Sequence, residues 1–227
     1  MNIAENLQRI KQELPSTVGL VAVSKFHPSE AVSKAYEAGQ RIFGESRPQE
    51  LFQKVSQLPE DIRWHFIGHL QTNKLKFVVP YVELIHSVDS LRLLEAIARY
   101  CEAHQLTVDV LLEVFIACEE TKSGFSVEEA ESLLMSDLLP ICGERVRIRG
   151  LMGMASLTDD QEQIRNEFKR LTALFDRVQQ HLVQHPSPVL AAFDIRSFGM
   201  SSDYRIAIEE GATYVRIGTD IFGPREY

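Results

Sequence analysis

The sequence predicts an α/β protein built as a single (β/α)₈ TIM-type barrel with one extra helix at its amino end. Eight short apolar runs alternate with longer amphipathic patterns, and no Gly/Ser/Pro-rich linker divides residues 1–227. A chain of 227 residues with 44% hydrophobic content is long enough to bury one substantial core. An open, doubly wound sheet stays an alternative, because counting strands does not establish that the sheet closes.

The individual elements follow from the spacing of apolar residues. A helix over about residues 2–13 is indicated by apolar residues at helical spacing, Ile3, Leu7, Ile10 and Leu14. Short apolar runs predict eight strands, at 19–24, 41–44, 63–68, 84–88, 108–115, 146–152, 189–194 and 213–217. Amphipathic patterns predict the helices between them, at 29–38, 48–58, 90–104, 126–134, 160–181 and 203–210, with 73–79 short and marginal.

The charge balance argues against a nucleic-acid partner. The formal net charge is −8, whereas binding to a phosphate backbone needs a basic face that displaces counterions. The basic residues within 145–149 alternate with apolar ones, which is typical of the outer face of a half-buried strand. These arginines are therefore expected to be structural.

The cysteines and the apolar segments indicate a cytoplasmic protein. The sequence has three cysteines, an odd number, at Cys101, Cys118 and Cys142. They are widely spaced and form no CxxC pair, which favours a reducing compartment over a disulfide framework or a zinc site. Residues 1–14 mix charged residues into the apolar positions, unlike the continuous apolar region of a signal peptide. No stretch approaches the roughly 20 apolar residues needed to span a bilayer, so no membrane role is expected.

Polar residues stand where several of the predicted strands end. In a parallel α/β barrel, functional groups collect at this carboxyl rim, where the strands pass into loops. The polar residues are Ser24, Lys25, Glu45, Ser46, His69, His86, Ser87, Arg216, Gly218 and Thr219. We therefore expect a pocket at one end of the barrel.

Lys25 is the most specific of these residues. A lysine that emerges from a barrel strand loses water around its ammonium group, which lowers its pKa and supplies a neutral amine for imine chemistry. The alternative is a lysine that extends its charged end into solvent at a strand terminus. Lys25 taken alone does not decide between the two.

Two neighbouring segments are compatible with a bound phosphate. Gly218 and Thr219 follow the last strand, and glycine lets a backbone approach an anion closely. Ser201, Ser202 or Asp203 can cap the helix that follows, leaving its first N–H groups for a phosphate. An ordinary turn and plain helix capping are the alternatives. Together with a strand-end lysine, however, the two segments match the needs of a phosphorylated aldehyde.

No metal site is expected. His65 and His69 have the spacing of two zinc ligands on a helix, but on a strand-to-loop segment that spacing does not place them on one face. Met152, Met154 and Met200 are interpreted as packing residues whose strand-end positions allow them to line a pocket wall.

Several segments resemble one family, the pyridoxal phosphate (PLP) homeostasis proteins, whose barrel is similar to the N-terminal domain of alanine racemase. The matching stretches occur in the expected order over nearly the whole chain. They are "LVAVSK" (20–25), "AYEAGQRIFGES" (35–46), "PQE" (48–50), "WHFIGHLQTNK" (64–74), "IHSVDS" (85–90), "EETKSGF" (119–125), "GLMGMA" (150–155), "GMSSDY" (199–204) and "AIEEGATYVRIGTDIFGPREY" (207–227).

The resemblance implies a PLP-binding barrel of fold type III. In it, Lys25 matches the lysine that forms the internal aldimine, Arg216 faces the pyridine nitrogen, and Ser201, Gly218 and Thr219 hold the phosphate. Ser46, His86 and Met200 complete the expected cofactor-binding set. A cation opposite the ring nitrogen keeps that nitrogen unprotonated and weakens the ring as an electron sink, so carbanion chemistry is poorly supported.

Three positions depart from the commonest family pattern. Ser46 replaces an asparagine expected near the cofactor, Phe26 stands where a small polar residue often follows the lysine, and Phe198 replaces a common methionine. None of these changes falls on Lys25, Arg216 or Ser201.

The resemblance implies a monomeric, non-enzymatic PLP carrier or regulator in vitamin B6 homeostasis, with effects on amino-acid metabolism. Alanine racemases of this fold add a β-rich domain, for which this chain has no sequence, and a racemase needs two bases on opposite faces of the cofactor. One alternative is a small PLP-dependent amino-acid racemase with Lys25 and His86 as its bases, and another is a Schiff-base aldolase. PLP-dependent apoenzymes are the macromolecular partners considered.

Overall fold

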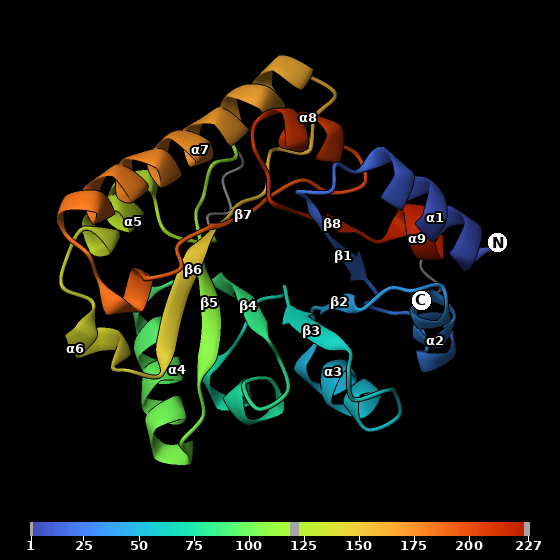
Figure 1. The fold of residues 1–227 in the computed structure, drawn as a ribbon, viewed down its shortest axis with the longest axis horizontal. Coiled ribbons are helices and arrows are strands. Elements are labelled where there is room, and N and C mark those ends of the chain that lie inside the picture. Colours follow the sequence, from blue (N-terminus) through green and yellow to red (C-terminus); the bar gives the residue numbers. More distant parts are fainter. Residues whose placement is uncertain (1, 119–122, 225–227) are drawn as a thin grey trace.

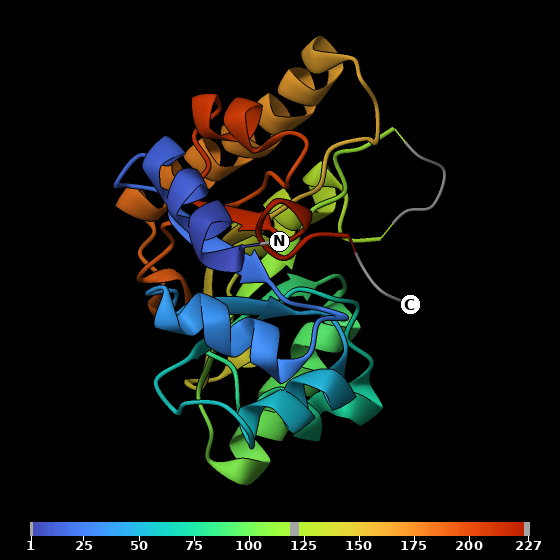
Figure 2. The ribbon, with the colours of Figure 1, turned by 90° about the vertical axis from the view of Figure 1, so that its right-hand side faces the viewer.

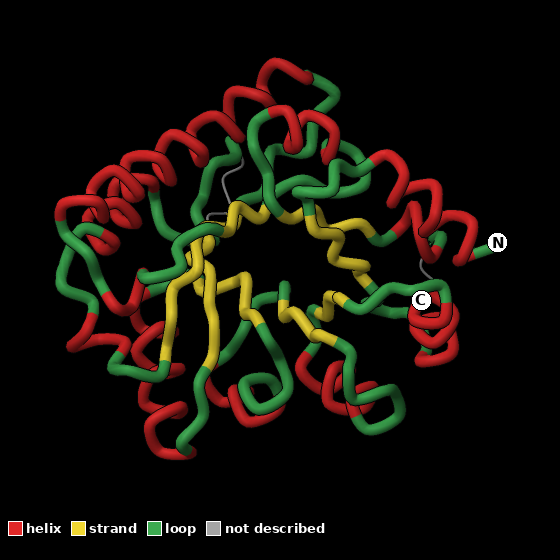
Figure 3. Tube along the Cα trace, viewed as in Figure 1, coloured by secondary structure: helices red, strands yellow, loops and turns green. Residues whose placement is uncertain are grey.

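The computed structural model describes residues 2–118 and 123–224. Its eight strands form a closed parallel barrel in sequence order, so that β1 pairs with β8. In Figure 3 the strands form a central ring that helices surround. The predicted closed barrel is confirmed, and the open sheet is excluded. The strands are β1 (Gly19–Val23), β2 (Ile42–Glu45), β3 (Arg63–Phe66), β4 (Leu84–Val88), β5 (Val108–Glu113), β6 (Val146–Met152), β7 (Ile195–Ser197) and β8 (Tyr214–Ile217).

The helices cover the outside of the barrel (Figure 1). Side-chain caps start some of them: Ser126 and Glu129 form a capping box at α5, and the Asp160 side chain accepts hydrogen bonds from the first amides of α7. The helices are α1 (Ile3–Glu13), α2 (Ser29–Glu37), α3 (Pro48–Val55), η1 (Thr72–Phe77), α4 (Leu91–His104), α5 (Val127–Leu134), α6 (Leu139–Cys142), α7 (Gln161–Gln184), η2 (Pro188–Leu190), α8 (Tyr204–Glu209) and α9 (Thr219–Phe222).

Alternate residues of each strand face opposite sides of the barrel wall. On β5, Val108, Val110 and Leu112 join the large apolar core between strands and helices, whereas Leu111 belongs to a separate small cluster. That cluster takes one residue from each of several strands, as expected inside a barrel. Its members are Leu84, Leu111, Met152 and Ile195, with Tyr214 packed against them.

The extra amino-terminal helix is confirmed, and it packs beside the last helix. Leu7 and Ile10 of α1 are fully buried, and the Asn6 amide group donates to the Ile221 carbonyl of α9 at 3.2 Å. Figure 2 shows α1 in dark blue next to α9 in red. The two ends of the described chain therefore meet on one side of the barrel.

The seventh strand was expected at 189–194, and this prediction is wrong. Residues 188–190 form the short helix η2, which Pro188 opens, and the strand follows at Ile195–Ser197. Val189 and Leu190 are buried as an apolar pair in the helical turn. A short apolar run thus signals burial here without specifying extended backbone.

Smaller differences concern the ends of elements. The marginal helix at 73–79 is a 3₁₀ helix, the short helix α6 was not expected, and β5 ends at Glu113, before residue 115. Asp203 takes the cap position of α8, but its side chain makes no cap bond to that helix. Residues 119–122 of the "EETKSGF" stretch and 225–227 lie outside the described residues. Among the residues described, no helix is long and apolar enough to cross a membrane.

Candidate functional site

The loops after β1 and β8 meet at the carboxyl rim of the barrel. A side-chain carbon on Gly218 would lie 3.1 Å from the Val23 carbonyl oxygen, so the backbone after β8 passes directly over the end of β1. Further along, the His27 ring stacks on Phe222 of α9, with ring centroids 5.2 Å apart. Lys25 is half-buried between these two contacts. The structure therefore brings Lys25 and the Gly218–Thr219 turn into one neighbourhood.

The segment 199–203 forms a tight turn next to Arg216. The Arg216 amide donates to the Gly199 carbonyl at 2.9 Å, and the Asp203 amide donates to the Met200 carbonyl at 3.1 Å. The Asp203 carboxylate in turn accepts the Met200 amide at 2.5 Å. This turn holds half-buried Ser201 at the same rim as Gly218.

Arg216 is a buried cation that crosslinks three strands. Its side chain donates to the Ser197 carbonyl and hydroxyl oxygens at 2.7 Å each, and to the Gly153 carbonyl at 3.0 Å. Burial lowers the pKa of Arg216 to about 10, while the nearby carboxylates of Asp203 and Glu113 act in the opposite direction. Arg216 therefore stays charged at neutral pH, and three hydrogen bonds hold its guanidinium in place.

Below Arg216, a chain of hydrogen bonds runs through the barrel interior. The Ser197 hydroxyl lies 2.9 Å from His86 Nδ1, and His86 Nε2 lies 2.9 Å from His65 Nδ1. Arg216 donates to the Ser197 hydroxyl oxygen, and the tautomers of the two imidazoles set the direction of the hydrogen bonds that follow. Burial lowers the pKa of His65 to about 4 and that of His86 well below its usual value. Both imidazoles are therefore neutral.

The structure places His86 differently from the other expected cofactor residues. His86 is completely buried, and both of its ring nitrogens are engaged with Ser197 and His65. Its hydrogen-bonded connection to Arg216 runs through the Ser197 hydroxyl. Ser46 and Met200 are half-buried, and Thr219 is exposed at the rim. Ser46 packs closely against Gly68, which lies in the loop after β3.

A buried ionic cluster next to Lys25 was missed from the sequence. Lys54 of α3 lies 2.6 Å from Glu45 and 2.8 Å from Glu50, and it is 4% exposed. Burial raises the pKa of the Glu45 carboxyl to about 7, although Lys54 and the Ser24 hydroxyl oppose the rise. The available signal was a lysine four residues after Glu50 on a helix face that is otherwise apolar.

A second acidic residue missed from the sequence is Glu113, at the end of β5. It is 6% exposed, and burial and the neighbouring Asp89 raise its pKa, while Arg216 acts against them. Its position at a strand end was the available signal, but the strand was expected to continue to residue 115. Glu113 therefore places a buried carboxyl group at the rim, close enough to Arg216 for the two groups to interact.

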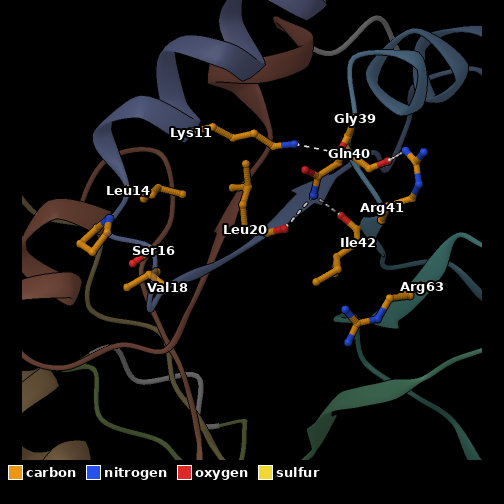
Figure 4. Close-up of a pocket in the computed structure, with 11 residues that line it drawn as sticks. Lys11, Leu14, Ser16, Val18, Leu20, Gly39, Gln40, Arg41, Ile42 and Arg63 are labelled. Atoms are coloured by element: carbon orange, nitrogen blue, oxygen red, sulfur yellow. Dashed lines mark hydrogen bonds between the residues drawn. The ribbon is translucent and has the colours of Figure 1, made fainter.

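Two of the cavities lie at opposite ends of the barrel. One of about 320 Å³ (Figure 4) opens at the amino end, where Lys11 donates to the Gly39 carbonyl at 2.9 Å and Gln40 donates to the Leu20 and Ile42 carbonyls. The Lys11 and Gln40 side chains are thus engaged within the protein. At the carboxyl end, a cavity of about 770 Å³ lies beside α4 and α5.

The two histidines that have zinc-like spacing do not converge. His69 lies 3.0 Å from Asp89 at the surface, whereas His65 bonds to His86 in the interior. Within residues 2–118 and 123–224, no three His, Cys, Asp or Glu side chains form a group that could hold a metal ion.

Comparison with known proteins shows full-length relatives. The family model of the alanine racemase N-terminal domain matches residues 1–226. A pyridoxal phosphate homeostasis protein of Aquifex aeolicus is 36% identical, with 100% of both chains covered. One of Schizosaccharomyces pombe is 37% identical over 91% of this chain and 84% of its own.

Solved structures show the same barrel. PipY of Synechococcus elongatus PCC7942 with PLP bound has a TM-score of 0.82 at 36% identity, covering 97% of this chain and 100% of that chain. Alanine racemase of Bartonella henselae, at 18% identity and a TM-score of 0.70, covers 100% of this chain and 61% of its own, and shares the fold. The barrel is that of PLP fold type III, and the chain belongs to the pyridoxal phosphate homeostasis protein family.

Proposed function

We propose that this protein binds PLP at the carboxyl rim of its barrel and acts in PLP homeostasis without catalytic turnover. The observation that carries the proposal is the buried Arg216 cation, which lies beside the 199–203 turn. The PLP-bound structure of PipY, 36% identical over 97% of this chain, supports it. The names of the full-length relatives support the homeostasis role.

The residues at the rim fit the chemical groups of PLP. Arg216 is suited to face the pyridine nitrogen, because a guanidinium that stays charged keeps that nitrogen unprotonated. The middle of the 199–203 turn and the start of α9 offer main-chain N–H groups to a phosphate. Gly218 suits this role, because a β-carbon there would contact the end of β1.

Lys25 is proposed to hold the cofactor covalently. Its amine attacks the aldehyde carbon of PLP, a C=N bond replaces the C=O bond, and one water molecule leaves. Bound PLP supplies an electron sink for amino-acid chemistry, and Arg216 opposite the ring nitrogen weakens that sink. Lys25 is half-buried beside the segment that contains Gly218, which supports its assignment.

The placement of His86 supports a carrier over a racemase. A racemase needs a second base on the face opposite the lysine. His86, the candidate for that base, is 0% exposed, is held on both ring nitrogens and resists protonation. Delivery of PLP to apoenzymes is consistent with the family name and stays a prediction.

The absorption spectrum tests the binding proposal. We expect wild-type protein mixed with PLP to show the visible band of a Schiff base, and Lys25→Ala to lack it. Lys34→Ala, which removes an amine from the outer helix α2, is the matched control and keeps the band. A band of equal strength in Lys25→Ala contradicts the assignment of Lys25.

Chiral chromatography tests the absence of turnover. PLP-loaded protein incubated with L-amino acids, one at a time, is expected to leave each enantiomer unchanged. Accumulation of the D-enantiomer with wild type but not with Lys25→Ala contradicts the carrier proposal and supports the racemase.

A further inference from the structure

The backbone on both sides of Lys25 is held by side chains of one helix, α3. The Ser24 carbonyl accepts a hydrogen bond from the Lys54 ammonium group at 2.8 Å, and the Phe26 amide donates one to the Glu50 carboxylate at 2.7 Å. These two groups belong to the two peptide units that flank Lys25. Both units are therefore anchored to the same helix, four residues apart on one face.

The two anchors are joined in a buried ionic network. Lys54 binds the same Glu50 oxygen that accepts the Phe26 amide, at 2.8 Å, and binds Glu45 of β2 at 2.6 Å. The Ser24 hydroxyl donates to that Glu45 oxygen at 2.7 Å. Glu45 is 0% exposed and Lys54 is 4% exposed, so water does not weaken these charge-assisted bonds.

The anchored segment has a conformation that its sequence disfavours. Phe26 adopts a φ of 65°, in the left-handed region that residues with a β-carbon seldom occupy. Such a conformation persists where its surroundings enforce it. The Glu50 bond to the Phe26 amide does so, helped by the Arg47 guanidinium, 4.2 Å from the centre of the Phe26 ring. The turn itself is closed by the His27 amide, which donates to the Ser24 carbonyl at 3.1 Å, and the contacts from α3 help to hold it.

We infer that Glu45, Glu50 and Lys54 are positioning residues that fix the backbone at Lys25. The Lys25 amine is thereby restricted to few conformations before it reacts with the aldehyde of PLP. The inference rests on the proposed attachment of PLP to Lys25. Fixing a reacting group in advance removes part of the entropy that bond formation would otherwise cost. The contacts that carry this role are those of Lys54 with the Ser24 carbonyl and of Glu50 with the Phe26 amide, so the residues act through the peptides that flank Lys25.

Three variants of α3 test the inference. Glu50→Ala removes the acceptor of the Phe26 amide. Glu50→Gln keeps an acceptor oxygen but loses the charge, and Gln53→Ala changes an exposed residue of the same helix as the matched control. Two quantities are measured: hydrogen exchange in the peptide that contains Phe26, without cofactor, and the rate at which the Schiff-base band forms after PLP is added.

In Glu50→Ala we expect the Phe26 amide to exchange faster and the band to form about tenfold more slowly, because the amine is no longer held in one place. Glu50→Gln should show smaller changes in the same direction, and Gln53→Ala should match wild type. If Glu50→Ala fails to fold, the inference is tested by comparing Glu50→Gln with Gln53→Ala in both measurements, the exchange at Phe26 and the rate of band formation.

Two results overturn the inference alone. One is unchanged exchange at Phe26, which means that Glu50 does not anchor the segment, and the other is faster exchange with an unchanged rate of band formation. A wild-type protein that forms no band refutes the proposed function itself, and the inference falls with it. The Glu50 variants therefore test the inference, and the wild-type protein tests the proposed function.

Discussion

At the scale of the residue, Glu45 shows how burial sets the charge of a side chain. Its carboxyl is fully buried, one oxygen bonds to Lys54 and Ser24, and the other oxygen has no hydrogen-bond partner among the described residues. Burial raises its pKa from 4.5 to about 7. Between these values the folded protein binds a proton that the unfolded chain has released. The contribution of Glu45 to stability therefore falls as pH rises through this window.

Glu45→Gln is expected to remove this pH dependence. The free energy of unfolding of the wild type, relative to the variant, should fall by on the order of 2 kcal/mol between pH 5 and pH 7, since one pKa unit corresponds to about 1.4 kcal/mol. Urea unfolding followed by circular dichroism at several pH values measures it. Glu60→Gln, at an exposed position, should run parallel to wild type. Parallel curves for Glu45→Gln would contradict the raised pKa.

At the scale of the element, Gly150 decides how β6 pairs with β7. It has a φ of 151°, and an added β-carbon would lie 1.8 Å from the Ile195 carbonyl oxygen. The register between β5 and β6 also shifts at this point, between Val110 and Leu111. A residue without a side chain lets β6 bend here, so that its carboxyl end and Gly153 meet Arg216.

Gly150→Ala is therefore expected to destabilise the protein by about 3 kcal/mol or more, because the collision is with backbone that cannot move aside. Gly143 is the matched control: its φ is 59°, but an added β-carbon would meet no atom within 4 Å. Gly143→Ala should cost only about 1 to 2 kcal/mol, for backbone strain alone. Equal urea midpoints for the two variants would show that the close approach to Ile195 is unimportant.

At the scale of the whole molecule, α1 belongs to the same packed structure as the barrel. Leu7 and Ile10 lie in the large apolar core, and Glu13 at the end of α1 bonds to Tyr204 and Arg205 of α8. These hydrogen bonds lower the pKa of Glu13 to about 2. The helix thus covers the seam where the last strand returns to the first.

Leu7→Ala should destabilise the whole protein by about 2 to 5 kcal/mol, because it leaves a cavity in a fully packed core. Leu157, which is 94% exposed, provides the matched control, and Leu157→Ala should change stability by less than about 0.5 kcal/mol. A single cooperative unfolding transition, shifted in the first variant only, is expected by both fluorescence and circular dichroism. A second transition for α1 alone would contradict its integration.

The sequence by itself determined the number and order of the strands, because apolar periodicity is a local property of the chain. It also placed Lys25, Arg216 and Gly218 at strand ends, and parallel strands bring all such ends to one rim. The seventh strand was predicted at 189–194 in place of Ile195–Ser197, because its three residues carry too little pattern and the neighbouring apolar turn carries more.

Only the tertiary structure decided which partners these residues take. Ser197 and His86 are 111 positions apart and Arg216 and Gly153 are 63 apart, yet each pair is hydrogen-bonded. Such pairs depend on how the strands are staggered when the barrel closes, and no local pattern encodes that stagger. For the same reason the sequence did not show that Glu45 pairs with Lys54: the two charges become costly, and therefore paired, only when α3 packs against β2.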